Sequence, residues 1–162
     1  MEGTVLAPTS PLDRFIDRTL TGALIVFGAA TCLPIVLTID VALGNRLLFR
    51  NELPSAPATD LVLRHWGFLV ACVGLLMIAA AFRPWLRFAT IGIAAAEKAV
   101  LVLLVLASSG QPWAEAFRTS ALIDGAITLY CLLYFLSRSG RPHRWVRDAA
   151  EGSWRTPPSD RR

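Results

Sequence analysis

Two ionisable residues, Glu97 and Lys98, stand side by side in the middle of a long apolar stretch, and Lys98 is the only lysine of the chain. At a rise of about 1.5 Å per helical residue, each would lie roughly 15 Å from either end of a membrane-spanning helix. A charge at the centre of a bilayer costs at least about 2.5 kcal/mol, so such residues usually have partners or a function. Two hypotheses follow: the pair belongs to a ligand, ion or proton site, or it neutralises itself and specifies helix packing.

Neighbouring positions on a helix point about 100° apart, so Glu97 and Lys98 should each require a further partner. Polar residues of other apolar stretches lie at a similar depth: Thr31, Cys32, Thr128 and Tyr130. A hydrogen bond between Glu97 and Tyr130 is the pairing that we expect. Glu97, Lys98 and Tyr130 are therefore the candidate ligand or proton site.

A second polar cluster is predicted at the outer end of the molecule. If the apolar stretches form antiparallel helices, the residues that reach this end together are Asp40, Arg64, His65 and Asp124. Their opposite charges predict a salt-bridged lid. Asp124 also lies about one turn into its helix, where the helix dipole favours an anion. Because His65 has no second histidine nearby, it does not indicate a metal site.

These residues must be positioned by membrane-spanning helices. The 162 residues are 54% apolar and 17% charged, with a mean hydropathy of +0.52, so the charges must be concentrated between apolar blocks. Apolar runs of about 20 residues span a bilayer as helices. We therefore expect an all-α membrane protein, with a four-transmembrane-helix antiparallel bundle at 19–136 between an N-terminal segment at 1–18 and a basic tail at 137–162. The expected spans are about 19–39, 66–82, 88–107 and 121–136.

The connections between the spans differ in length. Residues 40–65 are expected to form the longest loop, whereas the link at 83–87 forces a tight antiparallel return. Pro34 lacks an amide donor, so it should leave the Ala30 carbonyl free and kink the first span. Small residues at four-residue spacing predict close helix packing within the bundle or a dimer face: Gly67 and Ala71, Gly92 and Ala96, Ala121 and Gly125.

The basic residues indicate orientation. Eleven lie in the N-terminal segment, the 83–87 link and the tail, against four in the other two loops. Because basic loops stay in the cytoplasm, both termini should be cytoplasmic. The Arg-rich tail should attract anionic lipid headgroups, and nucleic acid is not an expected partner because no aromatic-interleaved module accompanies the charge. The preference for Arg over Lys is typical of a high-GC genome, so we expect the cytoplasmic membrane of a bacterium.

Sequence motifs of the common enzyme classes are absent. The chain has no P-loop, H-E-x-x-H pair, G-x-S-x-G elbow or haem-attachment motif. Its cysteines lie in apolar stretches without a C-x-x-C pair, so neither a disulfide nor a zinc site is indicated: Cys32, Cys72 and Cys131. No catalytic residue or metal is assigned, and a non-enzymatic role is favoured.

Three stretches carry a resemblance to a known group. They are "RHWGFLVACVGLLMIAAAF" at the second span, "RPWLRFATIGIAAAEKAVLVLLV" with its Pro-containing turn and mid-span charges, and "ALIDGAITLYCLLYFL" at the fourth. In these the chain resembles the DoxX-like small four-span bacterial membrane proteins over roughly residues 20–136. The resemblance implies a four-helix bundle, and the group's name derives from a subunit linked to quinone oxidation. It transfers no site residue to this chain.

Three functional interpretations remain open. The first is an accessory or scaffold protein of the membrane that has no cofactor. Its partners would be lipids and either another membrane protein or a second copy of the chain. The second is an oxidoreductase accessory subunit that binds a quinone-like lipid through Glu97, Lys98 and Tyr130. The third is a small proton-linked transporter in which Glu97 carries the proton.

Overall fold

The computed structural model describes residues 10–50, 53 and 56–139, and every regular element in these residues is helical. The long helices are α1 (Pro11–Cys32), α4 (Pro57–Phe82), α5 (Arg87–Ala107) and α7 (Arg118–Ser139). Shorter elements connect them: α2 (Ile35–Ile39), α3 (Val41–Phe49), the 3-10 helix η1 (Pro84–Leu86) and α6 (Pro112–Ala116).

Within the described part of the chain, four helical segments are long and apolar enough to cross a membrane: Pro11–Ile39, Pro57–Phe82, Pro84–Ala107 and Arg118–Ser139. The prediction of an all-α, four-span membrane protein is thereby confirmed. The spans begin earlier than the apolar runs because polar residues continue the helices outward. In α1, the Ser10 hydroxyl accepts from the Asp13 amide and the Asp13 carboxylate accepts from the Ser10 amide, which closes a capping box at the helix start.

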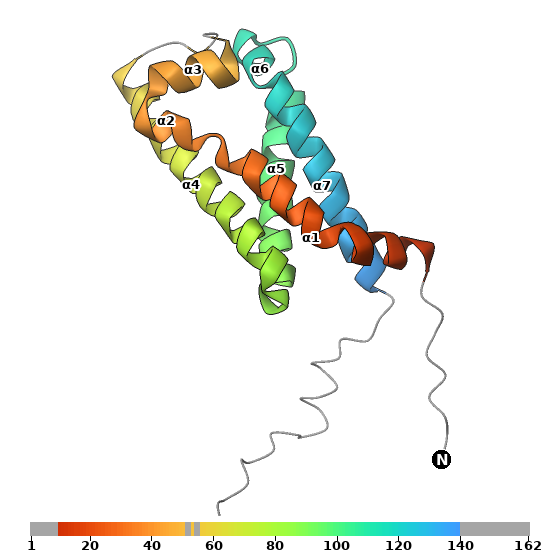
Figure 1. Ribbon diagram of the computed structural model, residues 1–162. Coiled ribbons are helices and arrows are strands. Elements are labelled where there is room, and N and C mark those ends of the chain that lie inside the picture. The colour runs from red at the N-terminus through yellow and green to blue at the C-terminus, as the bar shows by residue number, and fades with distance from the viewer. Residues whose placement is uncertain (1–9, 51–52, 54–55, 140–162) are drawn as a thin grey trace, which may run out of the picture.

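The region at 40–65 is not the open loop that was expected. Asp40 caps α3 by accepting a hydrogen bond from the Leu43 amide at 3.0 Å, and α4 already begins at Pro57. Asp40 has the short side-chain acceptor that favours helix N-caps, which is why a helix starts there. In Figure 1, α3 lies across one end of the bundle, beside α6.

Pro34 interrupts the first span, as predicted. α1 ends at Cys32, and α2 restarts at Ile35. The prediction of a free Ala30 carbonyl was wrong, because the Leu33 amide donates to it at 3.2 Å. The last turn of α1 tightens to an i+3 bond, which is a common way to satisfy carbonyls at a helix end.

α1 packs mainly against α4, and α5 packs mainly against α7. The backbones of α1 and α4 approach each other closely at Gly28 and Gly74: a Cβ on Gly28 would lie 2.7 Å from the Gly74 oxygen, and one on Gly74 would lie 2.6 Å from the Gly28 oxygen. Gly67 similarly lies against the Pro34 carbonyl. By contrast, a Cβ on Gly92 or Gly125 would meet its nearest neighbour at 3.7 or 4.0 Å, so the lack of a side chain is not required at these positions.

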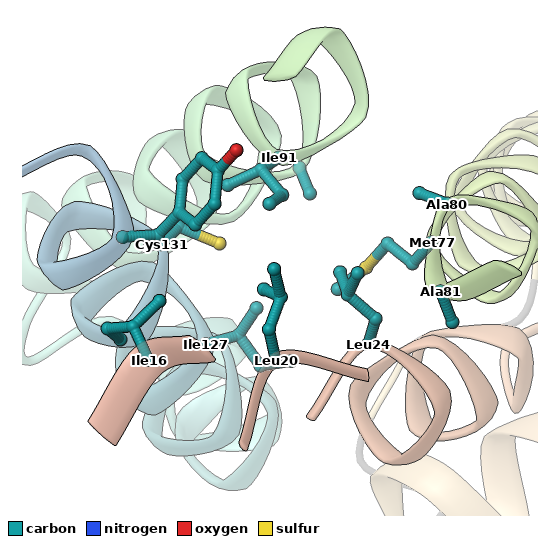
Figure 2. Packing of buried hydrophobic residues seen from close by; sticks show 11 residues of the cluster. Ile16, Leu20, Leu24, Met77, Ala80, Ala81, Ile91, Ile127 and Cys131 are labelled. Atoms are coloured by element: carbon teal, nitrogen blue, oxygen red, sulfur yellow. The ribbon is translucent and has the colours of Figure 1, made fainter. Parts of the chain in front are cut away.

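The apolar core is divided between the two ends of the bundle. One cluster joins all four long helices near the start of α1, and Figure 2 shows most of its side chains: Ile16, Leu20, Leu24, Met77, Ala80, Ala81, Ile91, Ala94, Ile127, Cys131 and Tyr134. A second cluster lies beneath α3 and α6 at the opposite end and includes Leu37, Val41, Phe49, Leu53, Leu63 and Ala116. Along the chain, Asp124 follows Phe117 of the second cluster and precedes Ile127 of the first.

Candidate functional site

Lys98 is the centre of a buried charge triad. Its ammonium Nζ lies 3.0 Å from Glu97 Oε2 and 3.3 Å from Asp124 Oδ1. The Lys98 side chain is only 3% exposed, while those of Glu97 and Asp124 are 26% and 10% exposed. With all three groups ionised, the triad carries one negative charge in excess. The long, flexible stem of lysine reaches both carboxylates, although Glu97 is its neighbour in sequence.

The antiparallel pair α5 and α7 brings Lys98 and Asp124 together. Because α7 begins at Arg118, Asp124 lies nearly two turns inside the helix, deeper than the single turn that was expected. Its contact with Lys98 shows that it is level with the middle of α5. Asp124 therefore belongs to the mid-membrane site, and its assignment to the outer cluster was wrong.

Glu97 is incompletely satisfied. Its Oε2 contacts the ammonium of Lys98, yet this buried oxygen accepts no hydrogen bond of acceptable geometry among the described residues. The contact is thus an ion pair held by charge rather than by a well-directed hydrogen bond. One carboxylate of the triad retains acceptor capacity.

The expected hydrogen bond between Glu97 and Tyr130 is not formed. Tyr130 shares a 2.8 Å hydrogen bond with Thr19 of α1, and its ring packs edge-on against Phe27. Tyr130 lies six residues beyond Asp124 in α7, about 9 Å nearer the opposite end of the bundle. Tyr130 and Glu97 both lie near the midpoints of their helices, but α5 and α7 pack so that Lys98 is level with Asp124 rather than with Tyr130.

The expected outer lid is not formed either. Within residues 10–50, 53 and 56–139, no two of Asp40, Arg64, His65 and Asp124 form an ion pair with each other. The Arg64 guanidinium instead donates to the carbonyls of Thr38 and Ile39 at 2.8 and 3.1 Å, at the end of α2. His65 is exposed on α4. The carbonyls at the end of a helix lack donors within the helix, so they bind the Arg64 guanidinium in place of the carboxylate of Asp40 or Asp124.

A pocket of about 80 Å³ adjoins the triad. Its polar wall consists of Lys98, Asp124, Thr31 and Ser120, and its remaining lining is apolar: Ala30, Leu33, Pro34, Leu48, Phe49, Trp66, Val70, Leu101, Ile123 and Ile127. Neither Glu97 nor Tyr130 is among the lining residues. A mostly apolar pocket with a few convergent polar groups is the usual form of a small-molecule site.

Thr31 supplies an unsatisfied polar group in the pocket wall. The residue is 3% exposed, and its Oγ1 has no hydrogen-bond partner in the described part of the chain. Burying a hydroxyl without a partner costs about 1 to 3 kcal/mol, so such groups are uncommon and call for an explanation. Depth matching in the sequence indicated Thr31, but only the packing reveals that its hydroxyl is unpaired.

The described residues contain no group of three or more His, Cys, Asp or Glu side chains that could hold a metal ion. Comparison of the chain with protein-family models, with curated proteins and with solved structures finds no match. The functional argument therefore rests on the site itself.

Proposed function

We propose that this multi-pass membrane protein is an accessory bundle that binds a neutral, carbonyl-bearing lipid of the quinone-like class in the pocket beside Lys98. The observation that carries the proposal is the meeting of two hydrogen-bond donors in one apolar pocket. Lys98 has three N–H donors and two carboxylates nearby, and the Thr31 hydroxyl has no partner among the described residues. A carbonyl oxygen between them would satisfy both.

The charge of the triad favours a neutral ligand. Its two carboxylates already exceed its single ammonium, so an anionic head group would meet Asp124 in the pocket wall and Glu97 behind it. Like charges in a medium of low dielectric constant repel strongly. A carbonyl acceptor adds no charge and still accepts from Lys98 and Thr31.

The size of the pocket limits how much of the ligand it encloses. An engineered cavity of about 150 Å³ accommodates benzene, whereas this pocket has about 80 Å³. It is therefore suited to a polar head or the edge of a ring. The proposal further includes membership of the DoxX-like group and a place in a bacterial cytoplasmic membrane with both termini in the cytoplasm. Its support is the three resembling stretches and the distribution of Arg.

Binding can be measured through Trp66, which lines the pocket. Quinones quench tryptophan fluorescence, so a benzoquinone with a ten-carbon chain should quench the fluorescence of the purified protein in lipid nanodiscs. Trp66→Phe should remove the part of the quenching that comes from the pocket.

Thr31→Val keeps the shape of the side chain and deletes its hydroxyl. A net hydrogen bond of about 0.5 to 1.5 kcal/mol predicts roughly 2- to 12-fold weaker binding.

Thr128→Val is the matched control. Thr128 Oγ1 is also buried without a hydrogen-bond partner in the described residues, but Thr128 does not line the pocket. Its replacement should leave the affinity unchanged. Absence of saturable quenching, or equal effects of the two valine variants, would refute the proposed site.

Proton-linked transport is a second candidate, because the triad holds one carboxylate more than it holds cations and Glu97 Oε2 accepts no hydrogen bond from the described residues. Glu97 could accept a proton without breaking a hydrogen bond at that oxygen. This candidate predicts that the wild-type protein moves protons into liposomes containing a pH-sensitive dye and that Glu97→Gln abolishes the flux. Identical traces from protein-containing and empty liposomes would exclude it.

A further inference from the structure

The pocket beside Lys98 opens through an apolar rim. Of the fourteen described residues that line it, only Leu33 and Ile123 are exposed, at 61% and 49%. Leu33 lies in the break between α1 and α2, and Ile123 lies in α7, so both belong to membrane-spanning segments. An apolar rim on two such segments is suited to contact with lipid chains rather than with water.

The packing of α1 explains why the mouth exists. Near the start of α1, Asp17 binds Arg138 of α7 at 2.6 Å and Thr19 shares its hydrogen bond with Tyr130. Further along, the contact between Gly28 and Gly74 holds α1 against α4. Figure 1 shows the consequence: α1 crosses α7 near one end of the bundle and leans away from it toward α2. Leu33 and Ile123, one from each side of this divergence, both line the pocket.

Toward α3, the pocket is closed by aromatic side chains. Phe49 at the end of α3 is 1% exposed, with its ring centroid 4.7 Å from that of Phe117 and 6.3 Å from that of Trp66. Trp66 and Phe117 also contact each other edge to face, at 6.0 Å. Interlocked rings of this kind exclude water, so this end of the pocket offers a poor route for a water-soluble ligand.

We infer that the mouth between α1 and α7 is a lateral portal, through which the hydrocarbon chain of the bound lipid extends into the bilayer while its polar head stays at Lys98 and Thr31. The inference rests on the proposed function and specifies its ligand as a molecule with a chain. Three observations converge on it: the donors lie at the inner end, the rim is apolar, and the volume of about 80 Å³ leaves no space for a chain inside.

If the portal exists, a bulky side chain at the rim should weaken the binding of a quinone that carries a hydrocarbon chain and should leave the binding of the quinone head group alone unchanged. The probes are the benzoquinone with a ten-carbon chain and the same quinone without the chain, both measured by fluorescence quenching in nanodiscs and expressed per mole of lipid. Ile123→Trp should weaken binding of the chain-bearing quinone by about tenfold or more, since the bound chain must occupy the rim at equilibrium. The quinone without a chain should retain its affinity within about twofold.

Leu122→Trp is the matched control, because Leu122 is the neighbouring exposed residue of α7 and does not line the pocket. It should leave both affinities unchanged, and the melting temperatures of both tryptophan variants should match that of the wild type. Equal responses of the two quinones to Ile123→Trp would overturn the portal and leave the head-group site intact. If neither quinone binds the wild-type protein, the proposed function fails and the portal fails with it.

Discussion

The ammonium of Lys98 lies 3.3 Å from the carboxylate of Asp124 and joins α5 to α7 in the middle of the bundle. Because Lys98 also contacts Glu97, the only lysine of the chain is balanced by two carboxylates from two helices. A structural neutralisation would need one carboxylate. Three features favour a site over a purely structural pair: the second carboxylate, the adjoining pocket, and the Thr31 hydroxyl, which has no partner in the part of the chain that the structure describes.

Breaking the triad from one side should be costly. Lys98→Met leaves two carboxylates buried without a counter-charge, and loss of one partner from a buried pair costs about 3 to 5 kcal/mol. The combination of Glu97→Gln, Lys98→Met and Asp124→Asn removes every charge and should recover most of the stability. Thermal unfolding in detergent measures both variants. If Lys98→Met alone were as stable as the wild type, the triad would contribute little to the free energy of folding.

The same triple variant separates stability from function. If the triad is structural only, the triple variant should still support the phenotype of a deletion strain and quench with quinone as the wild type does. If Lys98 binds the ligand, the variant should fold and yet lose binding. Complementation and fluorescence quenching, carried out on the same variant, decide between the two.

The contact between Gly28 and Gly74 should tolerate no side chain. Gly74→Ala would place a methyl group 2.6 Å from both the Gly28 oxygen and Cys32 Sγ, so α1 and α4 would have to separate. Overpacking of this kind typically costs about 1 to 3 kcal/mol. Gly92→Ala is the control, because the added Cβ would lie 3.7 Å from its nearest neighbour. Alanine also has a higher helix propensity than glycine. Equal melting temperatures for the two variants would contradict the close approach.

The connection between Asp17 and Arg138 should stabilise the protein more than an ordinary surface pair. The Arg138 guanidinium binds Asp17 at 2.6 Å and also lies 5.5 Å from the ring centroid of Tyr134. Arg138→Gln should therefore lower the melting temperature more than Arg118→Gln does. Arg118 pairs with Glu115 at 3.5 Å, with both side chains mostly exposed, and such pairs contribute about 0 to 1 kcal/mol. The reverse order would indicate that the connection is not structural.

The predicted orientation can be checked with reporter fusions. Arginine is concentrated in the segments assigned to the cytoplasm, so alkaline phosphatase fused after Arg147 should be inactive. The same enzyme inserted between α3 and α4 should be active. Arg147 and the rest of the predicted basic tail beyond residue 139 lie outside the described residues, so this prediction rests on sequence alone. The opposite pattern of activity would reverse the orientation.

The sequence by itself determined the helical class, the number of spans, the break at Pro34 and the burial of Lys98. Each follows from a property that is local to the chain. A run of apolar residues must form a helix in lipid because its backbone groups have no other partners, and a proline breaks that helix wherever it occurs. The mid-span position of Glu97 and Lys98 is equally visible in the order of the residues.

Only the tertiary structure decided which residues meet. Asp124 rather than Tyr130 completes the site, and Arg64 binds helix-end carbonyls rather than Asp40. Thr31, in a pocket wall, has no hydrogen-bond partner among the described residues. Membrane-spanning helices are apolar on all sides, as the exposed Leu75 and the buried Met77 of α4 illustrate, so their sequences do not indicate which face packs inward. Helix rotation and register are set instead by close contacts such as that between Gly28 and Gly74, which depend on two segments at once.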